Sequence, residues 1–394
     1  MRVMSSAADT LLERIRQNDA DRDPERLALK YAAWRADPFA FLRGTAWLFN
    51  SRLPAIAALR DAPLAWACGD LHLENFGSYR GDNGLVYFDI NDFDEARLAP
   101  ATLDLLRLLS SVHVAAPGLA IAPDDVEALC AEALEVWVGT LASGKPRWVE
   151  RDTARGIVGD LLSSLRKRSQ RAFLDSRTRR HGKQRRIRLD NGKALPLHED
   201  EHDALLQRMQ DFALLQDDPH FFKPLDAARR ISGNASLGLP RYIVLVRGQG
   251  SPDGNALLDL KFATPGTDHS MVRHDPAQRL IAIQTRMQAI PNAFLQPLEW
   301  RLQHFVLRDL QPAQDRVDLA LCRRKPKRLA SLLQTQAEVL AWAQLRSAGQ
   351  HGSDSIEALQ NFAARKSWRT PLLRSAQQVA TQIRRDWQSF CAAS

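Results

Sequence analysis

The chain has 394 residues, of which 45% are hydrophobic and 25% charged, and its formal net charge is +8. This composition predicts a globular protein with a sizeable core, built as one large two-lobed domain or as two domains. The four cysteines are scattered and form no CxxC pair, which argues against a zinc site or a disulfide framework and favours a cytoplasmic location. No apolar run is long enough to span a bilayer, so no membrane partner is expected.

Residues 1–60 are predicted to form an N-terminal helical segment. Asp37 and Pro38 are typical of a helix start, and this helix is expected to continue through Leu48. Arg43 is flanked by apolar residues, and we expect it either to contact phosphate or to brace a carboxylate such as Asp94.

Two short loops dominate residues 61–220, which are expected to form a catalytic region with a basic linker. The first loop, 69–77, reads GDLHLENFG, and the second, 88–95, reads FDINDFDE. Between them, two short runs rich in aromatic and β-branched residues are separated by the turn sequence GDNG, which predicts a β-hairpin. Such a hairpin would return Asp92 to the side of Asn75.

The spacing in these loops is typical of phosphoryl transfer, in which a protein places a base beside the acceptor hydroxyl and holds metal ions against phosphates. In protein kinases the metal-binding Asn follows the catalytic Asp by five positions. Asn75 follows Asp70 by the same interval. Asp70 is therefore the predicted base, and Asn75 and Asp92 are predicted oxygen ligands of Mg²⁺.

Other polar residues of the two loops have less specific predictions. His72 is a candidate catalytic residue that could polarise a reacting group, although bracing the loop through a backbone hydrogen bond is the simpler interpretation. Asp89, Asp94 and Glu95 could add metal or substrate contacts, or could be plain polar loop residues; Asp94 is included in the predicted metal site.

Basic residues concentrate in segments 166–168 and 177–188. Such clusters attract polyanions, but these contain no interleaved aromatic residues for base stacking, so nucleic acid is not an expected partner. The first interpretation is a solvated linker between lobes. The others are a funnel for an anionic substrate at the mouth of a cleft, which we prefer, and nonspecific nucleic-acid binding.

Residues 221–320 are predicted to form a smaller β-rich, nucleotide-binding lobe. A loop containing Gly233, Ser236 and Gly238 leads into an apolar strand, a turn and a second apolar strand that carries Lys261. A Lys inside a buried strand needs an anionic partner, and nucleotide phosphate would supply one. Arg308 in a later strand is a further predicted nucleotide contact.

The final segment, 321–394, is predicted to be helical and to complete the large lobe. Apolar residues recur on one helical face between Leu329 and Ser347, as in a helix that packs under the catalytic loop. In kinases the Gly-rich loop and Lys precede the catalytic loop, whereas here they follow it. The order therefore predicts a circularly permuted α+β fold of the protein-kinase type.

These motifs resemble those of aminoglycoside phosphotransferases and choline kinases in segment 69–104. Segments FAFLRG at 39–44, GDLHLENFG, DFDEA and the Pro100 to Asp104 stretch resemble more closely a bacterial family called domain of unknown function 2252. The resemblance implies a kinase-like fold that uses ATP and Mg²⁺, with Asp70 as base and Asn75 and Asp92 as metal ligands. It also implies that Asp104 is a buried carboxylate bracing the catalytic loop, and that Arg43 is structural.

Two departures from the kinase pattern leave alternatives open. The glycine-rich loop has Ala235 in place of its middle Gly, and no helix Glu is evident as the partner of Lys261, for which Glu299 or Asp259 could substitute. We therefore expect an ATP-dependent phosphotransferase acting on a small-molecule or protein hydroxyl. The alternatives are a nucleotidyl transferase and a pseudokinase-type protein that binds nucleotide or polyanion without turnover.

Overall fold

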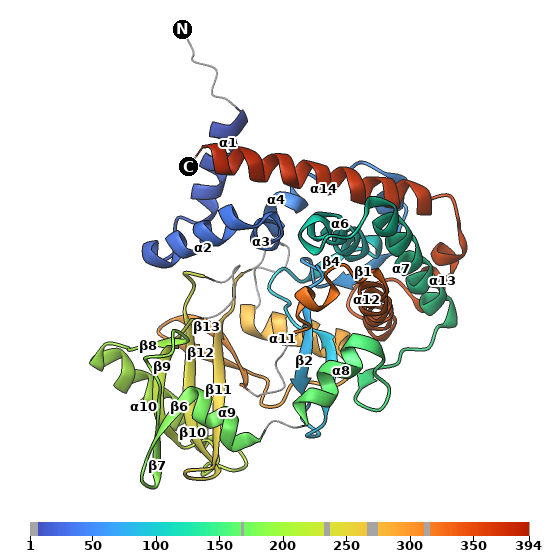
Figure 1. Ribbon diagram of the computed structural model, residues 1–394. Helices are drawn as coiled ribbons and strands as arrows, with labels where there is room; N and C mark the ends of the chain where they lie inside the picture. The colour runs from blue at the N-terminus through green and yellow to red at the C-terminus, as the bar shows by residue number, and fades with distance from the viewer. Residues whose placement is uncertain (1–6, 167–168, 232–236, 266–274, 311–315, 394) are drawn as a thin grey trace.

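The computed structural model describes residues 7–166, 169–231, 237–265, 275–310 and 316–393. It is a mixed α+β protein, as predicted, with a mainly helical part and a part built on a six-stranded antiparallel sheet (Figure 1). No helix in these residues is both long and apolar enough to cross a membrane.

The helical part is formed by both ends of the chain. Helix α12 packs against α7, and α14 packs against α6 (Figure 1). Its helices are α1 (Ala7–Asn18), α2 (Pro24–Ala36), α3 (Pro38–Gly44), α4 (Ala46–Asn50), α5 (Ala57–Arg60), α6 (Thr102–Leu119), α7 (Pro123–Ser143), α8 (Gly156–Leu165), α12 (Pro326–Ser347), α13 (Ile356–Ala364) and α14 (Arg369–Ala392), with a 3₁₀ turn η2 (Leu319–Cys322) before α12.

The predicted helix from Pro38 through Leu48 is interrupted. The Asp37 side chain caps its start by accepting hydrogen bonds from two backbone N–H groups of α3. Thr45 leaves the helical conformation, at φ −124° and ψ 41°, and its hydroxyl donates to the carbonyl of Phe41. The chain therefore bends into α4, and this bend places Arg43 and Trp47 in the wall of the cavity described below.

The predicted hairpin is confirmed as β2 (Phe76–Arg80) paired with β3 (Val86–Ile90). Gly84 in its turn has φ +82°, a conformation that favours glycine. The short strand β5 (Val149–Glu150) joins β3, and β1 (Leu64–Ala67) pairs with β4 (Arg97–Pro100) beside the hairpin.

The six-stranded sheet has the order β12-β13-β11-β10-β9-β8. Its strands are β8 (Ala194–Leu195), β9 (Pro224–Arg230), β10 (Arg241–Gly250), β11 (Gly254–Phe262), β12 (Gln296–Trp300) and β13 (Gln303–Asp309). The apolar runs around β10 and β11 thus form adjacent antiparallel strands, as predicted. Helix α11 (Pro276–Met287) lies between this sheet and the helical part (Figure 1).

Residues 170–214 pack on this sheet, whereas the sequence assigned all of 61–220 to the catalytic region. Helix α10 (Glu199–Leu214) shares a hydrophobic cluster with one face of the sheet, and α9 (Gln170–Arg177) shares another with the opposite face. The basic segment forms a hairpin of β6 (Thr178–His181) and β7 (Gln184–Ile187). It is therefore a structured extension of the sheet part rather than a linker.

Strand alternation gives the sheet two different faces. The even-numbered residues of β10, such as Tyr242 and Val244, pack in the cluster with α10. On the opposite face, Ile243 and Leu245 pack with α9, but the end of the face nearest the helical part carries charged side chains. These are Arg230, Arg241, Asp259, Lys261 and Arg308.

Candidate active site

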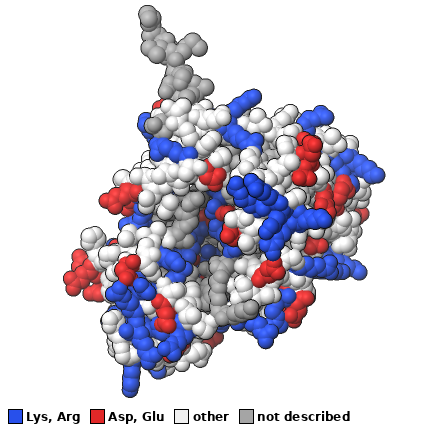
Figure 2. Space-filling view, viewed as in Figure 1, with Lys and Arg blue, Asp and Glu red and all other residues white. Residues whose placement is uncertain are grey.

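A cavity of about 950 Å³ lies between the helical part and the charged end of the sheet. Figure 2 shows the hollow between the two parts of the molecule. Both predicted loops reach this cavity, and so does the charged sheet face. Its ionisable wall residues include Asp70, Asp92, Asp94, Glu95, Arg43, Arg230, Arg241, Lys261, Arg308 and Arg316.

The loop that carries Asp70 is fixed by Asp104 at the start of α6. The fully buried Asp104 carboxylate accepts hydrogen bonds from the backbone N–H groups of Cys68, at 2.8 Å, and Gly69, at 3.1 Å. Gly69 has φ +82°, and a Cβ there would lie 2.1 Å from the carbonyl oxygen of Glu95. The two predicted loops thus touch through backbone atoms, and only glycine fits at their contact.

Replacing Asp104 by Ala is expected to lower the free energy of unfolding by about 3 kcal/mol, because two buried N–H donors lose their acceptor. Urea denaturation measures this loss. Asp125→Ala, which removes an exposed acid of α7, is the control and should change stability by less than about 0.5 kcal/mol. Equal stability of the two variants would contradict the bracing role of Asp104.

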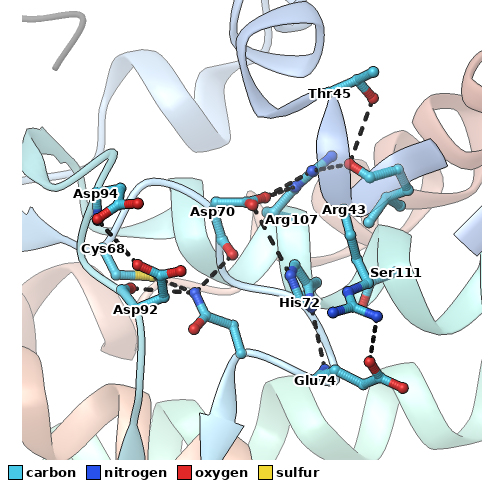
Figure 3. A network of polar contacts seen from close by, with 12 residues as sticks. Arg43, Thr45, Cys68, Asp70, His72, Glu74, Asp92, Asp94, Arg107 and Ser111 are labelled. Atoms are coloured by element: carbon cyan, nitrogen blue, oxygen red, sulfur yellow. Dashed lines mark hydrogen bonds and ion pairs between the residues drawn. The ribbon is translucent and has the colours of Figure 1, made fainter. Parts of the chain in front are cut away.

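Asp70 is held by a residue that the sequence did not single out. Arg107 of α6 donates to Asp70 Oδ1 from Nε at 3.0 Å and from Nη2 at 2.7 Å (Figure 3). Burial raises the pKa of Asp70 to about 7, although Arg107 acts in the opposite direction. A base with a pKa near neutrality combines an ionised fraction with useful basicity.

His72 lies beside Asp70 as a neutral imidazole. Its Nδ1 accepts a hydrogen bond from the backbone N–H of Glu74 at 3.2 Å, and its Nε2 is 3.9 Å from Asp70 Oδ2 (Figure 3). Burial, assisted by Arg43, Arg107 and Arg316, holds the pKa of His72 well below its usual value. This geometry braces the loop and directs a ring N–H toward the carboxylate of Asp70.

Arg43 does not contact Asp94, which was one of its two expected roles. Its Nη1 forms an ion pair with Glu74 Oε2 at 2.5 Å, so it connects α3 to the loop that carries Asp70. Asp94 instead pairs with Lys261. The side chain of Arg43 also lines the cavity, where phosphate contact remains a prediction.

Lys261 from β11 meets the acids of the second loop across the cavity. Its Nζ lies 2.8 Å from Asp92 Oδ1 and 2.8 Å from the Asp94 carboxylate, although 169 positions separate Lys261 from Asp92. Burial favours the neutral form of Asp92, but Lys261 outweighs it and lowers the pKa of this carboxyl below its usual value. Burial and the neighbouring Asp92 raise the pKa of Asp94.

The two substitute partners suggested for Lys261 lie elsewhere. Asp259 forms ion pairs with three arginines of the sheet, and Glu299 is exposed on β12. Helix α11 contains no acidic residue, and its Arg279 donates to the carbonyl of Ala96. In this structure the partners of Lys261 are therefore the two acids of the DFD sequence, Asp92 and Asp94.

The side chain of Asn75 joins the two loops through its amide nitrogen. Its Nδ2 donates to the backbone carbonyls of Asp70, at 3.0 Å, and Asp92, at 3.3 Å. Its buried Oδ1 has no hydrogen-bond partner among the described residues. Amide and carboxylate oxygens are the ligands that a hard cation such as Mg²⁺ prefers, so the residue types at this site fit such an ion. No group of three or more His, Cys, Asp or Glu side chains in the described residues forms a metal site by itself.

The glycine-rich loop is described only in part. Gly233 and Ser236, which were predicted to bind nucleotide, lie outside the described residues, as does Ala235. Gly238 has φ +91° and packs so closely on the α1–α2 turn that a Cβ would lie 2.8 Å from Arg22 Cβ. The neighbouring Leu239 and Pro240 line the cavity.

Several arginines of the site had no signal in the sequence that separated them from other arginines. Arg230, Arg241 and Arg316 line the cavity, and Arg107 lies behind it and holds Asp70. The partner of Arg107 is Asp70, 37 positions away in the sequence, so no local spacing pointed to it. Arg308, a predicted nucleotide contact, lines the cavity and lies 3.4 Å from Asp259 through Nε.

The basic hairpin takes no part in the cavity. Arg185 is buried between Asp175 and Asp253, at 2.6 and 2.8 Å, and no residue of 177–188 is among the described wall residues. Figure 2 shows basic side chains over this hairpin at the lower end of the sheet part. The expected funnel at the cleft mouth is therefore not formed by this segment.

The chain is an α+β protein with one cavity that is lined by Asp70, Asn75 and the cluster of Lys261 with Asp92 and Asp94. The family model described as "Uncharacterized protein conserved in bacteria (DUF2252)" matches residues 22–393, and the chain belongs to this family. Comparisons with curated proteins and with solved structures give no match.

Proposed function

We propose that the protein is a kinase-like transferase that moves a phosphorus-containing group from ATP to a hydroxyl of a small molecule or protein. The observation that carries this proposal is the contact of Lys261 with Asp92 and Asp94 at 2.8 Å. A phosphate-binding Lys, a metal-binding Asp and a base are the parts that phosphoryl transfer requires in one cleft. Lys261, Asp92 and Asp70 line the same cavity, which supports the assignment of these three roles.

The proposed fold is that of a circularly permuted, two-lobed kinase. Strands β9, β10 and β11, helix α11 and strands β12 and β13 would form the small lobe, with Lys261 on the third strand of the series. The helical part would form the large lobe, since Gln336 of α12 donates to the carbonyl of Leu73 in the catalytic loop at 2.8 Å. Termini that lie at a domain surface make such rearrangement tolerable.

In the proposed mechanism Asp70 accepts the proton of the acceptor hydroxyl. Arg107 fixes the orientation of the Asp70 carboxylate through hydrogen bonds to Oδ1, and the neutral His72 lies beside Oδ2. Asn75, Asp92 and Asp94 would hold Mg²⁺, which neutralises charge on the phosphates when bound. Lys261 would then bind phosphate oxygens with its ammonium group.

The pH dependence of turnover should follow the ionisation of the Asp70 carboxyl group. The base must be ionised, so turnover is expected to be low in acid and to rise through the pKa of Asp70, about 7. Arg107 lowers this pKa, so Arg107→Gln should move the rising limb to higher pH. Steady-state rates between pH 5 and 9 measure the limb, and an unchanged or acid-shifted limb in Arg107→Gln would contradict Asp70 as the base.

Asp92→Ala tests the proposal directly, because it removes the central carboxylate of the predicted metal site. The wild-type protein should show a rise in melting temperature with ATP that depends on Mg²⁺. Asp92→Ala should lose this rise, and the exposed control Asp125→Ala should keep it. If no nucleoside triphosphate stabilises the wild-type protein with Mg²⁺, the proposed function fails.

The second candidate function is a pseudokinase-type protein that binds nucleotide or polyanion as a regulator. The absence of an acidic residue in α11 favours it, because no helix carboxylate can hold Lys261 against phosphates. The presence of Asp70 with a raised pKa favours turnover. Binding of Mg²⁺–ATP without product formation would favour the regulatory protein over the transferase.

A further inference from the structure

Three arginines of the sheet converge on one carboxylate in the wall of the cavity. This arginine cluster is defined as Arg230, Arg241 and Arg308, which surround Asp259. Arg241 donates to Asp259 from Nε at 2.8 Å and from Nη2 at 2.5 Å, so this pair is bidentate. Arg230 Nη1 lies 2.6 Å from the same carboxylate, and Arg308 Nε lies 3.4 Å from it. All three arginines line the cavity, and Asp259 is fully buried.

The register of the sheet places this cluster beside Lys261. Asp259 and Lys261 are two positions apart on β11, so their side chains lie on the same face of the sheet. Arg241 of β10 is the register partner of Lys261, and Arg308 of β13 is the partner of Asp259. The cluster and Lys261 therefore gather four basic side chains from β9, β10, β11 and β13, which are neighbours in the sheet.

The cluster carries more positive charge than the acids around it compensate. Asp259 supplies one negative charge to three guanidinium groups whose side chains are only 10–12% exposed. Arg241 is also within electrostatic range of Asp92 and Asp94, but these two acids pair with Lys261 at 2.8 Å. Three acids thus face four basic groups. An excess cation in such a buried place is costly without a further anion.

Several N–H groups of the cluster are left for a second acceptor. Arg308 reaches Asp259 through Nε, and its two terminal nitrogens form no hydrogen bond with another described residue. Nη1 of Arg241 is likewise unused within the described part of the chain. Burial and the neighbouring Arg241 lower the pKa of Arg230 to about 10, which is the direction expected of crowded cations with too little negative charge nearby.

We propose that the arginine cluster is a binding site for a phosphate group of a substrate. Guanidinium groups that a carboxylate holds in place present pairs of N–H donors, which match the oxygens of a phosphate. A phosphate also supplies the negative charge that the cluster lacks, whereas a neutral nucleobase stacked on a guanidinium would leave the excess charge uncompensated. A nucleotide and a phosphorylated acceptor present the same phosphate oxygens, so the inference covers both sources.

This inference goes beyond the proposed function, because the site requires neither Mg²⁺ nor the base Asp70. Inorganic pyrophosphate in a buffer with EDTA, at constant ionic strength, therefore tests it without a nucleotide or a metal. The wild-type protein should bind pyrophosphate in a calorimeter. Arg241→Gln and Arg308→Gln should each bind it at least about tenfold more weakly, the loss expected for one charge-assisted contact.

Two further variants serve as controls. Arg247→Gln changes an exposed arginine of β10 and should bind pyrophosphate like the wild type. Arg308→Lys keeps the charge but removes the planar pair of donors, so its affinity should lie between those of the wild type and Arg308→Gln. Each cluster variant leaves two arginines on Asp259, and a melting curve without ligand shows that it is folded.

Three results would overturn the inference: no binding of pyrophosphate to the wild-type protein, unchanged binding in both Gln variants of the cluster, or an equal loss in Arg247→Gln. Adenosine, which has no phosphate, is the second probe, and its affinity should not depend on the cluster. If the cluster variants lose adenosine and keep pyrophosphate, the guanidinium groups hold a base and the inference is wrong.

Competition identifies the source of the phosphate. Displacement of pyrophosphate by ATP without metal assigns the cluster to the nucleotide, and simultaneous binding assigns it to the acceptor; both results support the phosphate site. The proposed function fails separately. Cluster-dependent binding of pyrophosphate without any binding of Mg²⁺–ATP would end the proposed function and leave this inference standing, and the reverse pair of results would do the opposite.

Discussion

Replacing Asp70 by Asn is expected to reduce turnover by about 10²- to 10⁴-fold, because Asn cannot accept the hydroxyl proton. Binding of Mg²⁺–ATP should be retained, since the side chains at the predicted metal and phosphate positions are Asn75, Asp92 and Lys261 rather than Asp70. Arg107 loses a charged partner but keeps its hydrogen bond to the carbonyl of Leu42. The expected signature is therefore a loss of rate without a loss of binding.

Labelled ATP and a bacterial cell extract measure this turnover, and calorimetry measures the binding. ATP labelled at the α- or γ-phosphate also identifies which group is transferred. Glu95→Gln is the matched control, because Glu95 is another acid of the same cavity whose pKa is raised by burial. Turnover by Asp70→Asn equal to that of the wild type would remove Asp70 from the mechanism.

The parts of the fold that the sequence predicted are those specified by local pattern. The hairpin at β2 and β3 follows from aromatic and β-branched runs around a GDNG turn, and β10 and β11 follow from apolar runs around a glycine-rich turn. Helix α12 follows from an apolar repeat, and its predicted face from Leu332 to Leu345 is buried. Each signal lies within a few neighbouring residues.

The placement of residues 170–214 on the six-stranded sheet depends on contacts between segments that are distant in the sequence. No local sequence pattern contains this information. Helix α10 has an apolar face, but only the folded chain shows that this face packs on the sheet, in a cluster with Tyr242 and Val244. The basic residues of the hairpin suggested a linker because their partners, such as Asp253 for Arg185, are distant in sequence. Charge density alone did not distinguish a solvated segment from a paired one.

In the candidate site, too, local spacing predicted some residues, whereas the partners that long-range contacts bring to them were not predicted. Asp70, Asn75 and Asp92 were chosen from spacing, and the hairpin brings them together as expected of neighbouring loops. The partners of each charge were not predictable, because Arg107 is one of many arginines and Asp259 differs from Asp92 only in its surroundings. In the folded chain Asp259 faces three arginines and Asp92 faces Lys261.

Lys261→Met is expected to abolish stabilisation by Mg²⁺–ATP and to strengthen binding of the metal ion alone. In the structure the Lys261 ammonium lies between the Asp92 and Asp94 carboxylates, at 2.8 Å from each, in the position that a cation would take. Its removal leaves the Asp92 and Asp94 carboxylates without their ion-pair partner, and only the more distant arginines still act on them. Affinity for Mn²⁺, a spectroscopic substitute for Mg²⁺, should then rise by about tenfold, which corresponds to one favourable charge interaction of about 1.4 kcal/mol.

This expectation makes Lys261 the group that links metal and nucleotide binding. In the wild-type protein, Lys261 must move from the carboxylates to the phosphates before the cation can take its place, so Mn²⁺ and ATP should each increase affinity for the other. Lys261→Met should lose this coupling, and Lys183→Met, at an exposed position of the basic hairpin, should keep it. Electron paramagnetic resonance of Mn²⁺ with and without ATP measures both quantities. If Mn²⁺ binds the wild-type protein and Lys261→Met equally, the ammonium does not compete with the metal, and Asp92 and Asp94 are a structural ion-pair cluster.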